Sequence, residues 1–267
     1  MSNHEENPGS RLLEIIGDEI SLIVDLEQGS RISSLRWRGL EFVVQPRPSL
    51  MDWGWYAMVP WAGRVKNGLI KDSSGREFTL PTNWEPPHAE HGYGFYSPWE
   101  KTSPTSSRLE MPSPYYPAVA QQRFELHENS LRWTLEYEAN GCDIPAWLGF
   151  HPWFVRQLAI GGSAELEFEA DRMLVKGSDV MPTGEYSPPK PPPWDDAFTD
   201  FKKLPSITWP GAAKVDLISQ APWWVIYTED KAGICVEPQS APPDAANLGI
   251  TGDHHIELVL HFSQSRN

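Results

Sequence analysis

Apolar and polar residues alternate along several short segments of the chain with a period of two. In residues 131–138 the odd positions are apolar and the even ones polar, and residues 164–169 and 255–262 show the same alternation. A strand that faces a core on one side and water on the other produces this pattern. We therefore predict half-buried β-strands in these three segments.

Further strands follow from the same reading. Residues 123–127, the polar turn Glu128-Asn129-Ser130 and the strand from Leu131 onward predict an antiparallel hairpin. No long segment combines a 3.6-residue apolar period with helix caps. Many short strands separated by turn signals favour an all-β fold, an antiparallel β-sandwich, over alternating strands and helices. The other predicted strands are residues 19–26, 32–37, 40–44, 223–228 and 234–237.

Domain organisation is predicted to be simple. We expect one domain over residues 1–267, with a polar and flexible N-terminus at residues 1–11 and no internal repeat. Composition shifts at residues 187–194, which hold five prolines. Prolines lack amide donors, so this segment is predicted to be a stiff, extended surface stretch. It is either a plain loop or a rim that fixes Asp195 and Asp196.

Composition and charge narrow the class of partner. The hydrophobic share of 40% and the charged share of 22% are ordinary for a soluble globular protein. A net charge of −14 disfavours nucleic acid and anionic membranes as partners, whereas a neutral small molecule is indifferent to it. Only Cys142 and Cys235 are present, and no signal-like or membrane-length apolar stretch occurs. We predict a cytoplasmic protein with a small-molecule partner; the sequence does not indicate an oligomeric state.

Common catalytic motifs are missing from the sequence. There is no phosphate-binding Walker loop, no complete dinucleotide glycine pattern, no G-x-S-x-G elbow and no H-E-x-x-H helix. This disfavours nucleotide hydrolysis, hydride transfer and serine hydrolysis. Five segments remain in which polar residues interrupt aromatic, Gly- or Pro-bearing stretches: residues 58–68, 88–95, 148–154, 194–198 and 234–245.

These five segments, in this order, resemble the aldose 1-epimerase (galactose mutarotase-like) family, and the resemblance runs from Ile20 to Phe262. It implies a large antiparallel β-sandwich (a supersandwich) with an open sugar-binding cleft on one sheet, a monosaccharide substrate and no cofactor. By their positions in the segments, His91 and His151 resemble the two active-site histidines and Glu237 the catalytic carboxylate. Arg64 and Asp195 resemble residues that hold sugar hydroxyls, with Asp196 in the place of Asp195 if the register differs by one.

The chemistry of anomer exchange fits these residue types. Opening a cyclic hemiacetal needs one group that takes the proton of the C1 hydroxyl and another that protonates the ring oxygen. We assign Glu237 as the base, His151 as the acid and His91 as the group that polarises the ring oxygen. Alternation places Glu237 and Cys235 on one face of their strand, and Pro238 predicts that this strand ends there or lies at a sheet edge.

Several alternatives use the same residues. A hexose-phosphate mutarotase could hold its phosphate with Arg64 plus Lys66 or Arg47. A non-catalytic sugar-binding or regulatory protein would keep the fold without turnover, and a glycosidase would need two cleft carboxylates. A metal site of histidines and Glu237 is disfavoured because alternation puts His88 and His91 on opposite faces and no ligand pair has a metal-typical spacing. We predict neither a metal nor a cofactor.

Overall fold

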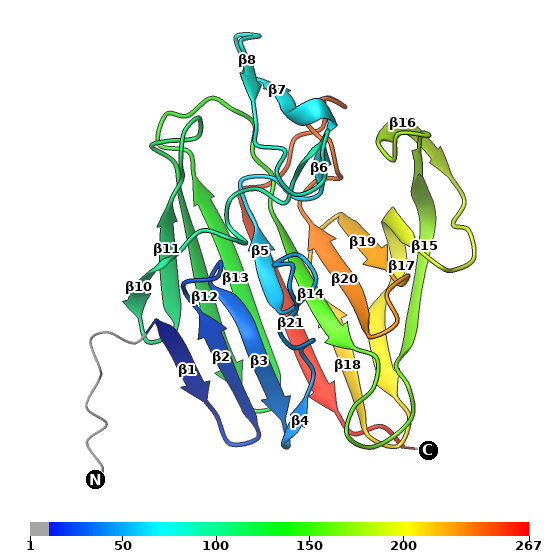
Figure 1. Ribbon diagram of the computed structural model, residues 1–267. Coiled ribbons are helices and arrows are strands. Elements are labelled where there is room, and N and C mark those ends of the chain that lie inside the picture. Colours follow the sequence, from blue (N-terminus) through cyan, green and yellow to red (C-terminus); the bar gives the residue numbers. More distant parts are fainter. Residues whose placement is uncertain (1–10, 267) are drawn as a thin grey trace.

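The computed structural model describes residues 11–266, and β-strands dominate this part of the chain (Figure 1). Within residues 11–266 the only helix is a short 3₁₀ turn, η1 (Lys66–Gly68), and no helix is long and apolar enough to cross a membrane. Of the predicted flexible N-terminus, residues 1–10 lie outside the described part.

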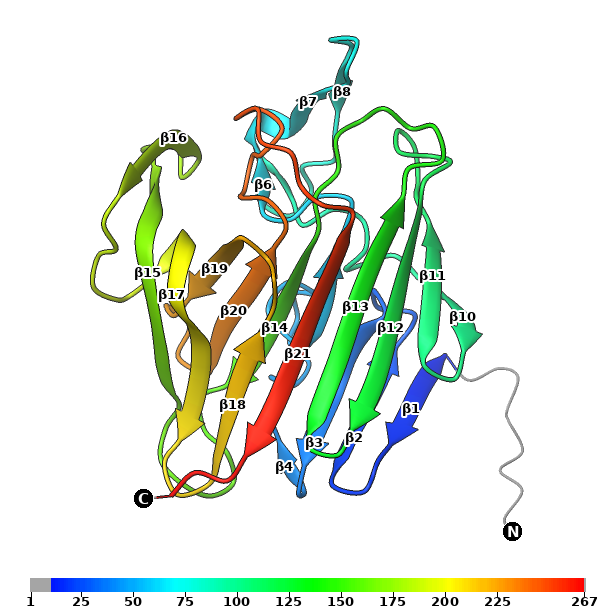
Figure 2. The ribbon, with the colours of Figure 1, turned by 180° about the vertical axis from the view of Figure 1, so that it is seen from behind.

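The strands form two stacked layers in which every named strand pair is antiparallel (Figures 1 and 2). In spatial order, the front layer holds β1 (Leu12–Ile16), β2 (Ile20–Asp25), β3 (Arg31–Trp37) with its short partner β4 (Leu40–Glu41), β5 (Trp55–Met58), β14 (Gly149–Val155), β20 (Gly233–Gln239) and β19 (Trp223–Tyr227). The back layer holds β18 (Ala213–Ile218), β21 (His255–Ser263), β13 (Ser130–Glu138), β12 (Val119–His127), β11 (Ser106–Glu110) and β10 (Glu100–Ser103).

One long strand, β17 (Asp195–Trp209), belongs to both layers. Its first five residues pair with β19, from Asp195↔Tyr227 to Thr199↔Trp223, and its last four residues pair with β18. On its other side β17 pairs with β15 (Glu165–Lys176), which carries the outer strand β16 (Pro182–Ser187). Two small ribbons complete the described residues: β6 (Arg64–Val65) with β9 (Ala89–Glu90), and β7 (Leu69–Lys71) with β8 (Glu77–Thr79).

The core lies between the two layers, where the alternation predicted from the sequence places the apolar side chains. Trp133 of β13 is fully buried, and its ring lies 4.2 Å from that of Phe150 on β14, so the layers meet there. Phe42 and Phe262 make a similar contact at 5.0 Å. Burying one large apolar side chain contributes about 1.5–3 kcal/mol, and this core holds many of them. The predicted all-β antiparallel sandwich is thus confirmed.

Two local expectations are wrong. Residues 40–44 were expected to form one strand, but regular pairing stops at Glu41 and Val43 makes only an isolated bridge to Phe154. The strand holding Glu237 was expected to end at Pro238 or lie at an edge, yet β20 runs between β14 and β19 and extends to Gln239. The proline is tolerated because the β14–β20 ladder is interrupted at this point, so the missing amide leaves no regular pairing unmade.

Candidate active site

A cleft of about 290 Å³ opens on the outer face of the front layer, over β14, β20 and β19 and beside the start of β17. The strands turn Phe150 and Val236 into the core and the alternate side chains toward the cleft. All five residues that the sequence singled out line this cleft: Arg64, His91, His151, Asp195 and Glu237.

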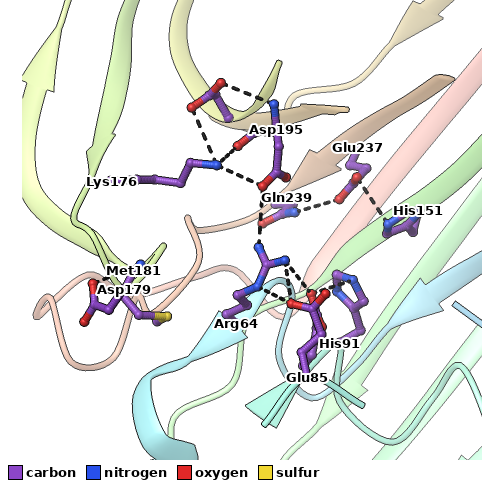
Figure 3. Close-up of polar contacts among 12 residues, drawn as sticks. Arg64, Glu85, His91, His151, Lys176, Asp179, Met181, Asp195, Glu237 and Gln239 are labelled. Atoms are coloured by element: carbon purple, nitrogen blue, oxygen red, sulfur yellow. Dashed lines mark hydrogen bonds and ion pairs between the residues drawn. The ribbon is translucent and has the colours of Figure 1, made fainter. Parts of the chain in front are cut away.

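The centre of the cleft is a contact between His151 on β14 and Glu237 on β20 (Figure 3). The ladder pairs Gly149 with Gln239 and Trp153 with Cys235, which leaves three residues between these pairs on each strand. His151 therefore lies directly across from Glu237. Its Nε2 is 3.3 Å from Glu237 Oε1, and the two side chains are only 8% and 3% exposed.

Aromatic and amide groups hold this pair in place. The ring of Tyr56 stacks on His151 with centroids 4.7 Å apart, and Trp153 stacks at 5.7 Å. Gln239 Nε2 donates a hydrogen bond of 3.3 Å to Glu237 Oε2. Oε1 of the carboxyl is thus the oxygen that faces the imidazole, and the ring's plane is fixed by its stacking partners.

Burial dominates the electrostatics of the pair. It raises the pKa of Glu237 well above the usual 4.5, and the charges of Asp195 and Glu90 add to this effect. Burial also lowers the pKa of His151 to about 3. Both neutral forms are therefore favoured, which places one proton on the pair as a whole.

His91 comes from a loop that is tied to another of the five segments. His91 and Gly92 both have positive φ angles, 55° and 72°, and Gly92 forms a parallel bridge with Val59. The His91 amide donates to the Gly63 carbonyl at 3.0 Å. These contacts set the His91 ring edge-on to His151, with centroids 4.9 Å apart, and burial, followed by the neighbouring His151, lowers the pKa of His91.

Arg64 reaches the cleft from β6, where it pairs with Glu90 of β9. Its Nε and Nη2 donate to Glu85 Oε2 at 2.9 and 2.7 Å, and Nη1 lies 3.9 Å from Asp195 Oδ2. Burial opposes its charge, but Glu90, Asp195 and Glu85 outweigh burial and raise the pKa of Arg64. The guanidinium is a permanent cation on the cleft wall.

The structure distinguishes the two neighbouring aspartates by their placement. Asp195 lines the cleft and its Oδ2 is 2.8 Å from Lys176 Nζ (Figure 3). Asp196 is 3% exposed, does not line this cleft and is held by Lys190 at 2.8 Å. Of the two, Asp195 is therefore the carboxylate that a ligand in the cleft can reach.

Three further cleft residues were not singled out from the sequence. Trp153 and Gln239 follow His151 and Glu237 by two positions, so period-two alternation could have found both. Glu90 could not be identified in the same way, because the turn at His91 interrupts the alternation of side chains. Its side chain is 4% exposed, its Oε2 has no hydrogen-bond partner among the described residues, and burial raises its pKa to about 8.

Two other features do not join this site. The Nδ1 of His88 accepts the Asn67 amide at 3.1 Å, and His88 does not line the cleft. A hollow of about 390 Å³ lies on the outer face of the back layer, where Arg132 pairs with Glu257 at 2.7 Å and His255 lies 3.3 Å from Glu136. Among the described residues, one trio brings potential metal ligands together: atoms of His151, Cys235 and Glu237 all lie within 4.8 Å of one another.

A β-sandwich with a carboxyl–imidazole pair at the floor of a polar cleft defines a protein suited to acid–base chemistry on a small polar ligand. Comparison with known proteins agrees with the fold and specifies the family. The model of the aldose 1-epimerase family matches residues 12–256, and the chain therefore belongs to that family.

Individual relatives are more distant. The chain is 26% identical over 270 residues to the uncharacterised protein YihR of Escherichia coli K12, covering 88% of this chain and 85% of the relative. A candidate aldose 1-epimerase structure from Escherichia coli K12 superposes with a TM-score of 0.80 at 21% identity, over 95% of this chain and 99% of the other. A galactose mutarotase-like protein from Clostridium acetobutylicum gives 0.77 at 15% identity, over 94% of both chains. These two structures support the fold.

Proposed function

We propose that this protein is an aldose 1-epimerase, a mutarotase that interconverts the α and β anomers of a monosaccharide. The observation that carries the proposal is the 3.3 Å contact between His151 Nε2 and Glu237 Oε1 at the floor of the cleft. Anomer exchange needs one acid and one base close enough to act on adjacent oxygens of the same carbon, and this pair supplies both. Family membership supports the same reaction.

The reaction proceeds in two mirrored halves. Glu237 takes the proton of the C1 hydroxyl while His151 gives a proton to the ring oxygen, and the bond between C1 and the ring oxygen breaks. The open aldehyde then rotates about C1–C2. On closure His151 takes back the proton of the former ring oxygen and Glu237 returns one to the C1 oxygen, so both side chains end as they began.

The pair holds one proton that can pass between the two side chains. Burial places the resting proton on Glu237, whereas the forward step uses the form in which His151 holds it. These forms differ by transfer of one proton between partners already in contact. Asp195 raises and Arg64 lowers the pKa of both partners, so each of these cleft charges acts on the pair as a whole.

The other cleft residues would bind and orient the sugar. Arg64 Nη1 and Asp195 Oδ2 lie on one wall and offer a donor and an acceptor to hydroxyl groups. Trp153 offers an aromatic surface to the apolar face of a sugar ring. His91, whose lowered pKa keeps it neutral, would donate a hydrogen bond to the ring oxygen or a neighbouring hydroxyl.

A hexose phosphate is the less favoured substrate. Arg47 is held by Asp230 through bonds of 3.0 and 3.2 Å, and Lys66 is 2.8 Å from Asp179. Of the three cations considered from the sequence only Arg64 lines the cleft, and it already binds carboxylates. Besides the protonated Glu90 and Glu237, four carboxyl groups line the same cleft and would repel a phosphate: Asp52, Glu85, Asp195 and Glu229.

The remaining alternatives receive less support. Burying ionisable groups is costly, and a non-catalytic sugar-binding protein would gain nothing from a carboxyl and an imidazole buried in contact.

We also propose a cytoplasmic location, in keeping with the two free cysteines.

Polarimetry tests the proposal directly. Freshly dissolved α-D-glucose, α-D-galactose and glucose 6-phosphate should each be followed with and without the purified protein. We expect faster approach to the equilibrium rotation with at least one neutral aldose and less acceleration with the phosphate. No acceleration with any aldose would overturn the proposal, and a preference for the phosphate would reinstate the hexose-phosphate alternative.

A further inference from the structure

Cys235 lies beneath the floor of the cleft and takes no part in the reaction just described. It is fully buried, and it shares the face of β20 with Glu237 because the two residues are two positions apart. On β14 its register partner is Trp153, the neighbour of His151 on the same face. The thiol therefore lies next to the carboxyl–imidazole pair.

The three side chains have the composition of a zinc site. Thiolate, imidazole and carboxylate are the ligands that zinc takes in proteins, at about 2.3, 2.0–2.1 and 2.0–2.2 Å. Two such nitrogen and oxygen ligands at a tetrahedral angle stand about 3.4 Å apart, and His151 Nε2 and Glu237 Oε1 are 3.3 Å apart. The Cys235 sulfur, one ring nitrogen of His151 and one carboxylate oxygen of Glu237 all lie within 4.8 Å of one another. A tetrahedral site with about 3.6 Å between sulfur and nitrogen therefore requires a shift of about 1.2 Å at most.

The surroundings favour capture of an ion. His151 and Glu237 line the cleft, so an ion in the cleft meets them directly, and the buried sulfur lies behind them. The three protein ligands leave the fourth position toward the cleft, for water or a hydroxyl. Gln239 holds the second carboxyl oxygen, which leaves Oε1 free to turn to the ion.

We propose that His151, Cys235 and Glu237 form a binding site for a thiophilic divalent cation of the zinc class, and that the bound ion inhibits the enzyme. Binding displaces the thiol proton and the proton shared by the pair, and the ion occupies the lone pairs that the proton transfers use. The inhibitory part rests on the proposed mutarotase function, whereas the binding part does not.

The test uses Cd²⁺ as a spectroscopic probe and Zn²⁺ as the inhibitor, with the metal-free full-length protein. The decisive variant is Cys235→Ala, and Cys142→Ala, which removes the half-buried thiol elsewhere, is its matched control. Parent and control should bind one Cd²⁺ with the ultraviolet charge-transfer band of a cadmium–thiolate bond. Cys235→Ala should lose the band and bind at least about 10–100-fold more weakly.

The kinetic arm separates the two proposals. Zn²⁺ should inhibit mutarotation by parent and control reversibly, and Cys235→Ala should keep its activity while needing at least about tenfold more Zn²⁺ for inhibition. The band needs no sugar, so it tests the site even if no mutarotation is found. Absence of the band in the parent, or equal inhibition of Cys235→Ala, would overturn the site. If Cys235→Ala does not fold, Cys235→Ser replaces it.

Discussion

At the residue scale, we propose that the carboxyl of Glu237 and the imidazole of His151 act as a unit, because one takes up a proton as the other gives one. Both are buried in direct contact at the floor of the cleft. A group placed in this way contributes to the rate through proton transfer far more than through binding.

Removing either partner should therefore reduce turnover while the cleft still binds sugar. We expect Glu237→Gln and His151→Asn each to lose about 10²–10⁴-fold in kcat, the usual contribution of a positioned acid or base. The double variant should lose much less than the product of the two factors, since each single change already disables the shared step. Polarimetric rates and a separate measurement of sugar affinity check this, and a Glu237→Gln enzyme within a few-fold of the parent would rule out the assignment.

Glu90 gives a prediction about stability and pH. Its pKa is raised by burial to about 8 from the usual 4.5, so the folded protein holds this proton more tightly than the unfolded chain. The stability that the group contributes is full below about pH 4.5 and is lost as the pH rises through about 8. The free energy of unfolding of the parent should therefore fall, relative to that of Glu90→Gln, as the pH rises from 5 to 8.

Urea denaturation at pH 5, 6.5 and 8 measures this difference. Glu138→Gln, which removes an exposed carboxyl at the end of β13, is the matched control and should follow the pH profile of the parent. A constant difference between parent and Glu90→Gln across this range would mean that Glu90 ionises normally in the folded protein.

At the scale of elements, the loop after β9 depends on one glycine. Gly92 has a φ of +72°, and a Cβ built there would lie 2.1 Å from the backbone oxygen of Val59. Nothing flexible can move aside, because the obstacle is backbone. The loop that carries His91 can approach residues 59–63 only with glycine at this position.

Gly92→Ala should therefore cost more than its unfavourable φ alone. Gly75 also has a positive φ, +85°, but a Cβ added there would meet nothing within 4 Å, so Gly75→Ala isolates the conformational penalty of about 1–2 kcal/mol. We expect Gly92→Ala to lose clearly more unfolding free energy than Gly75→Ala and to lower turnover by displacing His91, with turnover unchanged in the control. Equal losses of unfolding free energy in the two variants would show that the loop can move to accept a Cβ at position 92 without added strain.

The elements also show what the sequence could and could not predict. β13 and β21 were predicted because one face of each strand contacts the core and the other contacts solvent, so apolar and polar residues alternate along them. β14 was not predicted because both of its faces are buried, so its residues do not alternate between apolar and polar. Pro152 within the segment also made a loop the simpler interpretation. β17 was missed because its two halves serve different layers and no single pattern describes it.

For the candidate site, the resemblance to the family predicted five residues, and the pairing of distant strands is what brings them to one cleft. Alternation placed Glu237 and Cys235 on one face, but only the register of β14 against β20 brings His151 to them. Lys176 gives no signal in the sequence, because its contact with Asp195 depends on how β15 lies along β17.

At the scale of the whole molecule, the chain itself supplies every group that the proposed reaction uses. The proposed acid, base and hydroxyl-binding residues all line one cleft. Mutarotation should therefore persist in excess chelator and without any added nucleotide, and chelation should only relieve inhibition by trace zinc. Polarimetry before and after exhaustive chelation is the measurement. Loss of activity that a divalent ion restores would show that the reaction needs a metal.

Because His151 and Glu237 meet only when β14 pairs with β20, this pairing determines when activity can appear during folding. The two residues are 86 positions apart in the chain, and the ladder between their strands is anchored only on either side of them. Closing so long a loop is slow compared with forming a local hairpin such as β12–β13. A refolding chain should therefore regain much of its strand signal before it regains any catalysis. The return of mutarotation during refolding would thus report when β14 pairs with β20.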